Sequence, residues 1–324
     1  MMQPPFSITP RILNLVAEIS RQIGKLEGLR APAPQPRLRK QNRIKTIQGS
    51  LAIEGNTLEL DQVSAILDGK RVRGPKREVL EVENAIRLYE RISEFDPFLE
   101  KDLLRAHAIL MRDLVEDAGK YRQSGVGIIK GQEISHVAPP AKRVPELMSG
   151  LISFIRQTDD LSPLIRACVF HYELEFIHPF SDGNGRLGRF WQSLLLTRFY
   201  PVLAHLPVES VIHERQERYY LVLESCDRQG NSTEFVEFSL EAIRDALNEF
   251  MKEIRPEPDT AASRLTLAQR EFGERVFSRK DYLQFFKTLS TATASRDLAF
   301  GASEGLLRRT GTQAIAKYRF KVAK

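Results

Sequence analysis

Apolar residues recur at helical spacing through most of this chain, and this periodicity constrains the fold more than any other feature. In residues 10–29, Ile12, Leu15, Val16 and Ile19 fall three or four positions apart, as on the buried face of an amphipathic helix. The same spacing predicts helices over residues 38–53, 58–69, 77–95, 100–115, 143–157, 163–177, 185–200, 213–229 and 233–254. The sequence therefore predicts a mainly α-helical bundle.

Three segments interrupt the helical pattern and suggest how the chain is divided. The stretch APAPQPR (31–37) has too many prolines for a helix, and PEPD (256–259) is typical of a linker. Residues 119–144 are Gly-rich and β-like, which predicts a small β-hairpin flap among the helices. We expect an N-terminal helix with its linker over residues 1–37 and a helical domain over residues 38–255. A second linker would follow over residues 256–262, and a C-terminal domain over residues 263–324.

The C-terminal segment differs from the rest of the chain in charge and in pattern. Residues 261–324 carry 13 Lys and Arg against 5 Asp and Glu, whereas the other 260 residues carry 35 against 37. Three short helices followed by two strands is the order of a winged helix-turn-helix. Such a domain binds DNA in some proteins and contacts another protein or a second copy of itself in others. An inert basic surface is the third alternative.

Composition excludes some classes of protein. No apolar run approaches the ~18 residues that span a bilayer. The N-terminal residues lack the basic head and continuous apolar stretch of a signal peptide, so we expect a cytoplasmic protein with no membrane contact. The two cysteines, Cys168 and Cys226, form no CxxC pair and are expected to be buried apolar side chains.

The segment HPFSDGNGRLGRF (178–190) gathers the residue types that phosphate chemistry needs. Glycines bracketing Asn184 let backbone amides approach a ligand, and a helix that begins there favours a bound anion. Arg186 and Arg189 share one helical face and suit phosphate oxygens. Asp182 is a hard oxygen ligand for Mg²⁺, and His178 can take a proton from a hydroxyl. Each residue has an ordinary structural use alone, and only the combination is specific.

This segment resembles the motif of the Fic family, His-x-Phe-x-Asp/Glu-Gly-Asn-Gly-Arg-x-x-Arg, at every specified position. The resemblance extends over about residues 38–255 and includes KYR (120–122), HVAPPAKRVPELM (136–148) and RYY (218–220). It implies a Fic-type helical bundle that transfers AMP from ATP to a Ser, Thr or Tyr hydroxyl of a target protein. Related kinases carry Lys where this chain has Gly185, which favours AMP transfer over phosphate transfer.

The resemblance also implies a role for each residue of the motif. His178 would be the general base, and Asp182 would hold Mg²⁺. The nucleotide would be held by Gly183, Asn184, Gly185, Arg186 and Arg189, and Tyr219 would help to form the base pocket. The flap residues Ser135, His136 and Val137 would align the target segment by backbone pairing.

A second motif lies upstream, in SLAIEGN (50–56). Taken alone, Glu54 is a solvated carboxylate at a helix end that Gly55 terminates. Beside a Fic core, Ser-x-x-x-Glu-Gly resembles the inhibitory motif of the family. Glu54 would then pair with Arg189 in place of the γ-phosphate, and Ser50 would steady the helix.

Three functions remain open from the sequence. The first is an adenylyltransferase inhibited by its own Glu54. The second is a Fic enzyme that removes AMP or uses another nucleotide. The third is a DNA-binding regulator in which the Fic core senses a nucleotide.

Overall fold

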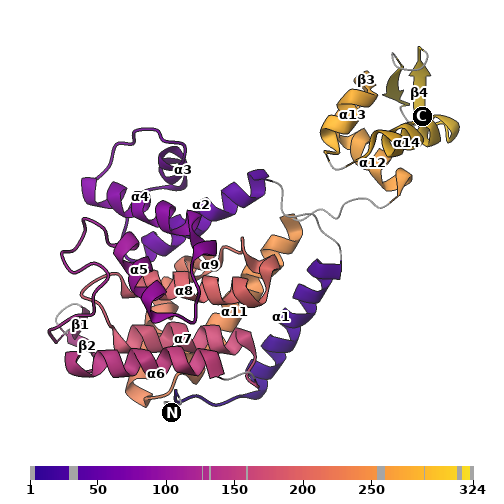
Figure 1. Cartoon of the computed structure of the whole chain (residues 1–324). Coiled ribbons are helices and arrows are strands. Elements are labelled where there is room, and N and C mark those ends of the chain that lie inside the picture. Colours follow the sequence, from indigo (N-terminus) through magenta and orange to yellow (C-terminus); the bar gives the residue numbers. More distant parts are fainter. Residues whose placement is uncertain are drawn as a thin grey trace. The chain divides into compact units, whose positions relative to one another are not determined.

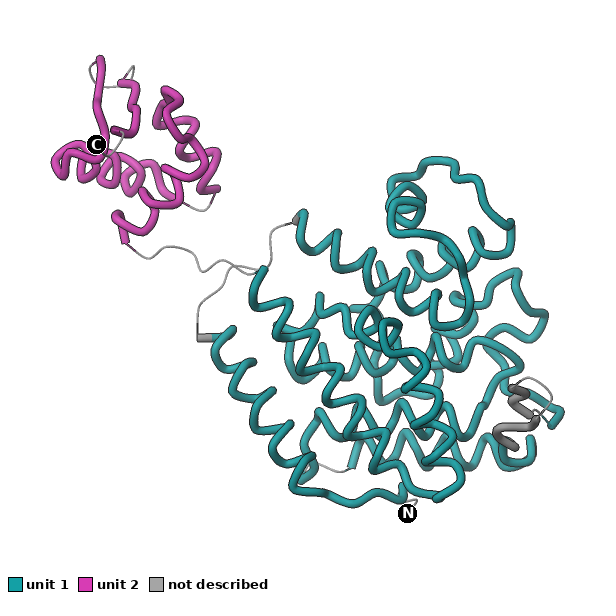
Figure 2. The backbone as a smooth tube through the Cα atoms, turned by 180° about the vertical axis from the view of Figure 1, so that it is seen from behind, with its two compact units in different colours: residues 1–254 teal, residues 255–324 magenta. Residues whose placement is uncertain are grey.

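The computed structural model describes residues 4–28, 36–125, 127–130, 133–157, 160–253, 260–287, 289–311 and 316–321. The chain forms two compact units, residues 1–254 and residues 255–324 (Figure 2). Helices dominate, as the apolar spacing predicts, and the mainly α fold class is confirmed (Figure 1). No helix in the described residues is both long enough and apolar enough to cross a membrane.

The first unit is a helical bundle that carries one small hairpin. Its helices are α1 (Pro10–Gly28), α2 (Pro36–Ile53), α3 (Leu60–Leu67), α4 (Lys76–Glu90), α5 (Glu100–Leu110), α6 (Val144–Gln157), α7 (Pro163–Ile177), α8 (Asn184–Phe199), α9 (Val208–Glu214), α10 (Gln216–Gln229) and α11 (Thr233–Glu253). The hairpin pairs β1 (Gly127–Lys130) with β2 (Glu133–Val137) in antiparallel fashion. Short 3-10 turns lie at Ile92–Glu94, Ala141–Arg143 and Pro201–Leu203.

Helix α7 lies at the centre of the bundle and packs on α6, α8 and α11. It is buried on nearly every side, and so is the first half of α8. A helix that is buried all round needs no polar face, which is why its sequence is weakly amphipathic. Polar side chains on these two helices therefore lie in the core, and the turn between the helices is fixed from both ends.

Three helices of the first unit differ from the sequence prediction. Helix α4 ends at Glu90 rather than at residue 95, and a 3-10 turn follows it. The pattern over residues 213–229 predicts one helix, but the chain bends at Arg215 and divides α9 from α10. Helix α5 ends at Leu110 rather than near Val115, and Asp113 has a positive φ of 60°. None of these breaks has a Pro or Gly at the bend, so sequence periodicity does not reveal them.

The second unit contains three helices and a three-stranded sheet. The elements are α12 (Ala261–Phe272), β3 (Phe277–Ser278), α13 (Arg279–Phe285), α14 (Thr291–Ser303), β4 (Leu307–Thr310) and β5 (Lys317–Phe320). The strand order is β3-β5-β4, with both pairs antiparallel. The sequence predicts the three helices and the β4–β5 hairpin but not β3. The winged-helix assignment stays an interpretation of this order.

Candidate active site

The backbone of the turn between α7 and α8 is held in a tight loop by hydrogen bonds within the turn. His178 caps α7 in the left-handed region, with φ 49° and ψ 60°. The Asn184 side chain accepts a hydrogen bond from the Phe180 amide at 2.9 Å and donates one to the Phe180 carbonyl at 3.0 Å. These two bonds close the loop beneath the first turn of α8. The unpaired amides at the start of a helix then provide a place for an anion.

Gly183 is required by the geometry of this turn. Its φ is 83°, which favours glycine, and a Cβ at this position would lie 2.6 Å from the Met111 sulfur. Any side chain here would push the loop away from the end of α5.

The Asp182 carboxylate lies at the edge of the turn between two arginines. One oxygen accepts from Arg186 Nη2 at 2.7 Å and from the Gly183 amide at 2.6 Å. The other accepts from Arg77 Nη2 on α4 at 3.1 Å. Arg186 also pairs with Glu81 at 3.2 Å. No cluster of three or more His, Cys, Asp or Glu in the described ranges could hold a metal without other ligands. A single carboxylate instead fits Mg²⁺ that binds together with nucleotide phosphates.

Arg189 reaches from α8 to the end of α2, 135 residues away in sequence. Its Nη2 donates to Glu54 Oε1 at 2.7 Å and to the Ser50 carbonyl at 2.9 Å, and its Nε donates to Ser50 Oγ at 3.1 Å. Arg189 is 1% exposed, yet among the described residues its Nη1 has no hydrogen-bond acceptor, and neither does the buried Nε of Arg186. Two buried cationic N–H groups without acceptors indicate an anion-binding site.

A second carboxylate, Glu175 on α7, faces this pair. A Cβ on Gly185 would clash with Glu54 Oε1 and would lie 2.9 Å from Glu175 Oε1 and 3.1 Å from Arg189 Nη1. Burial, together with the neighbouring Glu54 carboxylate, raises the pKa of Glu175 to about 7. Tyr219 is 1% exposed and donates its hydroxyl to Glu175 at 3.2 Å. Tyr219 therefore lies in the core, beneath the place where these carboxylates meet.

The His178 ring is oriented by the end of its own helix. Its Nδ1 lies 3.3 Å from the Glu175 carbonyl oxygen, which can only accept a hydrogen bond. This contact places the proton of the neutral ring on Nδ1 and the lone pair on Nε2. The ring is thus in the tautomer that a general base needs.

For the flap, the structure describes the backbone of the β1–β2 hairpin and not its side chains. Gly127 pairs with Val137 and Ile128 with His136, and the register then shifts so that Ile129 pairs with Ile134. The shift leaves Ser135 outside the ladder. The side chains of Ser135, His136 and Val137 lie outside the described part of the chain.

His107, on α5, supports the same turn and was not among the residues predicted from the sequence. Its Nδ1 accepts from the Gly119 amide at 2.8 Å, so its Nε2 carries the proton and donates to the Asp182 carbonyl at 2.9 Å. The ring also stacks on Phe180, with centroids 3.7 Å apart. Burial lowers the pKa of His107 to about 4, so the ring is neutral. No motif reveals this role, because both partners are backbone groups.

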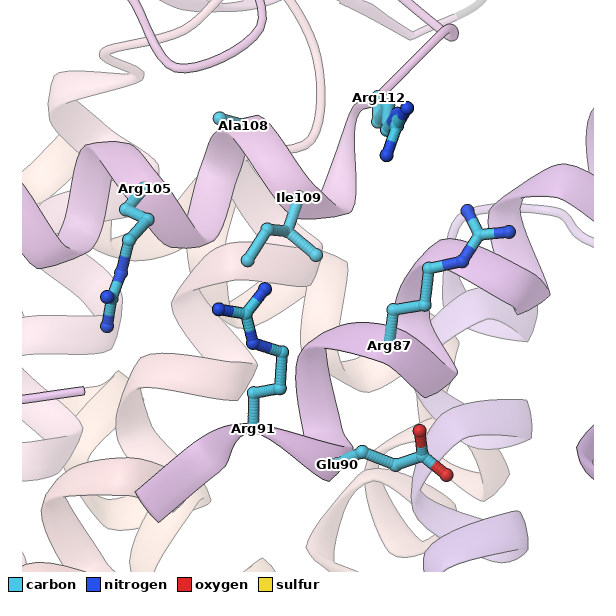
Figure 3. Close-up of a pocket in the computed structure, with 7 residues that line it drawn as sticks. All are labelled: Arg87, Glu90, Arg91, Arg105, Ala108, Ile109 and Arg112. Carbon is cyan, nitrogen blue, oxygen red and sulfur yellow. The ribbon is translucent and has the colours of Figure 1, made fainter. Parts of the chain in front are cut away.

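A separate cleft of about 350 Å³ lies between α4 and α5 (Figure 3). Its lining includes Arg87, Arg91, Arg105 and Arg112, with Ala108 and Ile109. Each arginine has a carboxylate of its own nearby, on Glu83, Glu94, Asp102 and Asp113 respectively. These pairs offset the positive charge, so the cleft lacks the unpartnered donors that mark the α8 site.

Comparison with known proteins points to one family. Residues 97–196 match the Fic/DOC family. The protein adenylyltransferase fic-1 of Caenorhabditis elegans is 28% identical over 259 residues, which is 74% of this chain and 48% of that protein. The protein adenylyltransferase Fic of Nematostella vectensis is 27% identical over 240 residues, 69% of this chain and 53% of that protein. The chain therefore spans about half the length of these curated relatives.

Solved structures give a longer match. The crystal structure of a Fic family protein from Desulfovibrio desulfuricans G20 is 45% identical, has a TM-score of 0.73 and covers 100% of this chain and 99% of its own. A fragment of Fic-1 from Caenorhabditis elegans has a TM-score of 0.61 at 23% identity, over 74% of this chain and 71% of its own. That second likeness concerns the fold alone.

Proposed function

The chain belongs to the Fic family, and from that premise we propose that it is a protein adenylyltransferase that transfers AMP from ATP to hydroxyl groups of target proteins and of itself. One observation carries the proposal. Arg186 and Arg189 carry buried N–H groups for which the described residues supply no acceptor, and both lie in the first turns of α8, which begins six residues after His178. An anion site and a proton acceptor at one turn are what transfer of a nucleotidyl group to a hydroxyl requires.

The proposed reaction uses each part of this turn. His178 Nε2 takes the proton of a Ser, Thr or Tyr hydroxyl, whose oxygen attacks the α-phosphorus of ATP. The bond between the α-phosphorus and the bridging oxygen breaks, and pyrophosphate leaves. The amides of Asn184 and Gly185 hold the α-phosphate in line for this attack, together with the Gly183 amide once it is released from Asp182.

The two arginines and Asp182 act on the rest of the nucleotide. Arg186 and Arg189 bind the β- and γ-phosphates, and Asp182 holds Mg²⁺. When bound, Mg²⁺ would neutralise part of the negative charge that develops on the leaving pyrophosphate. Tyr219 is proposed to support the nucleotide site from beneath through its hydrogen bond to Glu175, rather than to contact the base, because its ring is buried.

Glu54 is proposed to inhibit the enzyme by occupying Arg189. The carboxylate takes one N–H that the γ-phosphate would otherwise use, and the contacts of Ser50 hold the guanidinium toward α2. ATP that binds in this state lacks its terminal contact, so its α-phosphorus is misplaced for attack. The same carboxylate could direct a water for removal of AMP, and mass spectrometry of a modified target incubated with the wild-type chain tests that activity.

The flap is proposed to align the target. An extended segment that adds to the edge of the β1–β2 hairpin would bring its hydroxyl to His178 with little dependence on its side chains. Incubation of cell lysate with the Glu54→Gly protein, ATP and Mg²⁺ tests the activity, with His178→Ala as control. AMP on lysate proteins in the first sample only is the expected result. No AMP in either sample would contradict it.

DNA binding by the second unit is a further candidate, and one feature of its sheet favours it. Arg308 and Arg319 are direct cross-strand partners on β4 and β5, and both are exposed. Like charges in this arrangement repel each other. Arg319 also pairs with the exposed Glu274 at 3.0 Å, which offsets part of this repulsion, and a phosphate on this face would neutralise both arginines. Salt-dependent binding of duplex DNA that is weakened by Arg308→Ala tests this candidate. A second copy of the chain on this face would appear instead as a change in mass in solution.

A further inference from the structure

Arg122 is a buried arginine whose side chain bonds to backbone carbonyls. It is 2% exposed. Its Nε donates to the His178 carbonyl at 2.7 Å, and its Nη2 reaches the Ile177 carbonyl at 3.3 Å. Nη1 donates to the Ser124 carbonyl at 2.8 Å, and Nη2 to the Pro139 carbonyl at 2.6 Å. Within the described residues, its ion pairs and hydrogen bonds include no carboxylate. One guanidinium therefore joins three separate segments.

The first of these segments is the end of α7. The last carbonyls of a helix have no partner within the helix, and a cation is favourable beside them. Arg122 supplies both the donors and the charge at Ile177 and His178. Its backbone amide also donates to the Pro179 carbonyl at 3.0 Å. Arg122 therefore bonds to the carbonyl oxygens of both His178 and Pro179, and these two bonds hold the left-handed backbone at His178.

The other two segments are the ends of the flap. Ser124 precedes β1 and Pro139 follows β2, so Arg122 fixes both ends of the hairpin relative to each other. A planar guanidinium can bond in several directions at once, which a lysine ammonium on a flexible stem does not reproduce. The position of the flap and the backbone of His178 are consequently set by one side chain.

We propose that Arg122 is a positioning residue that couples the flap to the general base. It touches neither nucleotide nor target, and acts through the His178 carbonyl and the flap ends. A target segment that pairs with the hairpin is thereby held at a fixed position relative to the His178 imidazole. This inference rests on the proposed transfer of AMP for its effect on rate, but the physical coupling can be measured separately.

The kinetic test uses Arg122→Lys in the Glu54→Gly protein. We expect kcat for AMP transfer to fall about a hundredfold, since small misplacements of reacting groups cost this much. Affinity for a non-hydrolysable ATP analogue should stay unchanged, because the turn at 182–186 is held by other contacts. A matched control is Arg166→Lys, which alters another buried guanidinium, one that donates to the Ile155 carbonyl at 3.1 Å. The control should retain most of the activity.

A rescue experiment separates positioning from misfolding. Arg122→Gly should lose transfer, and added guanidinium ion, far below denaturing concentration, should restore part of it by occupying the vacated space. Equal kcat in the Arg122→Lys protein and its parent would overturn the coupling. So would a loss of equal size in the Arg166→Lys control.

Hydrogen exchange tests the coupling even if the parent transfers no AMP, an outcome that would count against the proposed function alone. In Arg122→Lys, exchange of amides 124–139 and 178–182 should rise together, while amides of α11 keep their protection. A rise in only one of the two segments, or in none, would show that Arg122 does not connect them.

Discussion

The carboxylate of Glu54 lies 2.7 Å from Nη2 of Arg189, across 135 residues of sequence. The contact joins the last turn of α2 to the first turns of α8, where the nucleotide is proposed to bind. Glu54 is partly exposed whereas Arg189 is buried. The pair can therefore open by movement of Glu54 alone, and Arg189 keeps its place for a phosphate.

Removing the Glu54 carboxylate should activate the protein. A hydrogen bond to a charged group contributes about 1.5–3 kcal/mol, so its loss should raise AMP transfer roughly tenfold to a hundredfold. The measurement compares incorporation of labelled AMP by Glu54→Gly and wild type. Glu116→Gly, which changes an exposed glutamate elsewhere, should behave as wild type. Equal labelling in all three proteins would contradict the inhibitory role.

Ser50→Ala should activate the protein less than Glu54→Gly. The substitution removes the acceptor for Arg189 Nε but keeps the carbonyl that Nη2 contacts. This bond joins a charged guanidinium to an uncharged hydroxyl, so we place it at the lower end of the range for charged groups, about 1.5 kcal/mol, which corresponds to a rise of up to about tenfold. The double variant Ser50→Ala/Glu54→Gly tells whether Ser50 acts through the pair of Glu54 and Arg189. If it does, the double variant should transfer AMP no faster than Glu54→Gly alone.

Inhibition by Glu54 should weaken as pH rises through neutrality. Arg189 is faced by Glu54 from α2, Glu175 from α7, Tyr219 from α10 and Glu209 from α9. Burial and the Glu54 carboxylate raise the pKa of Glu175 to about 7, so the closed pair is favoured while Glu175 is protonated. Above that pH the two carboxylates repel each other and Glu54 is released.

The pH effect is measured as the ratio of activities of Glu54→Gly and wild type. Between about pH 6 and pH 8 this ratio should fall, and Glu175→Gln should make it constant. A group that titrates equally in both proteins cancels in the ratio. A ratio that rises with pH would contradict the assignment of Glu175.

Asp182→Asn should abolish most of the transfer at low Mg²⁺. An amide lacks the negative charge that Mg²⁺ requires, so the Glu54→Gly/Asp182→Asn protein should lose activity on the order of a hundredfold or more. Part of this loss should return at high MgCl₂ concentration. Asp113→Asn is the matched control, since that carboxylate is exposed and asparagine suits its positive φ. Retained activity in Asp182→Asn at low Mg²⁺ would remove its role as metal ligand.

The local part of the site was predictable, because His178 to Arg189 lie within one turn of chain and its flanking helix. Their residue types alone indicated a phosphate site. The contact between Glu54 and Arg189 was expected only through the family resemblance, since no spacing links positions so far apart. The helices were predictable where one face is apolar, and the exceptions were the Arg215 bend and the ends of α4 and α5.

The supports of the turn were not predictable. His107 and Arg122 bond chiefly to backbone groups, and a carbonyl or amide leaves no trace in the residue pattern. Glu175 sits one turn before His178 in an apolar stretch, where a lone carboxylate has no obvious partner. Its significance follows from Gly185, whose missing side chain leaves room for both carboxylates.

The most direct test of the account is the intact mass of the Glu54→Gly protein after incubation with ATP and Mg²⁺. We predict a mass increase of one or more AMP groups on this protein and no increase on the Glu54→Gly/His178→Ala protein. An unchanged mass in both, together with no AMP on lysate proteins, would contradict AMP transfer. An equal increase in both would contradict the role of His178 as the base.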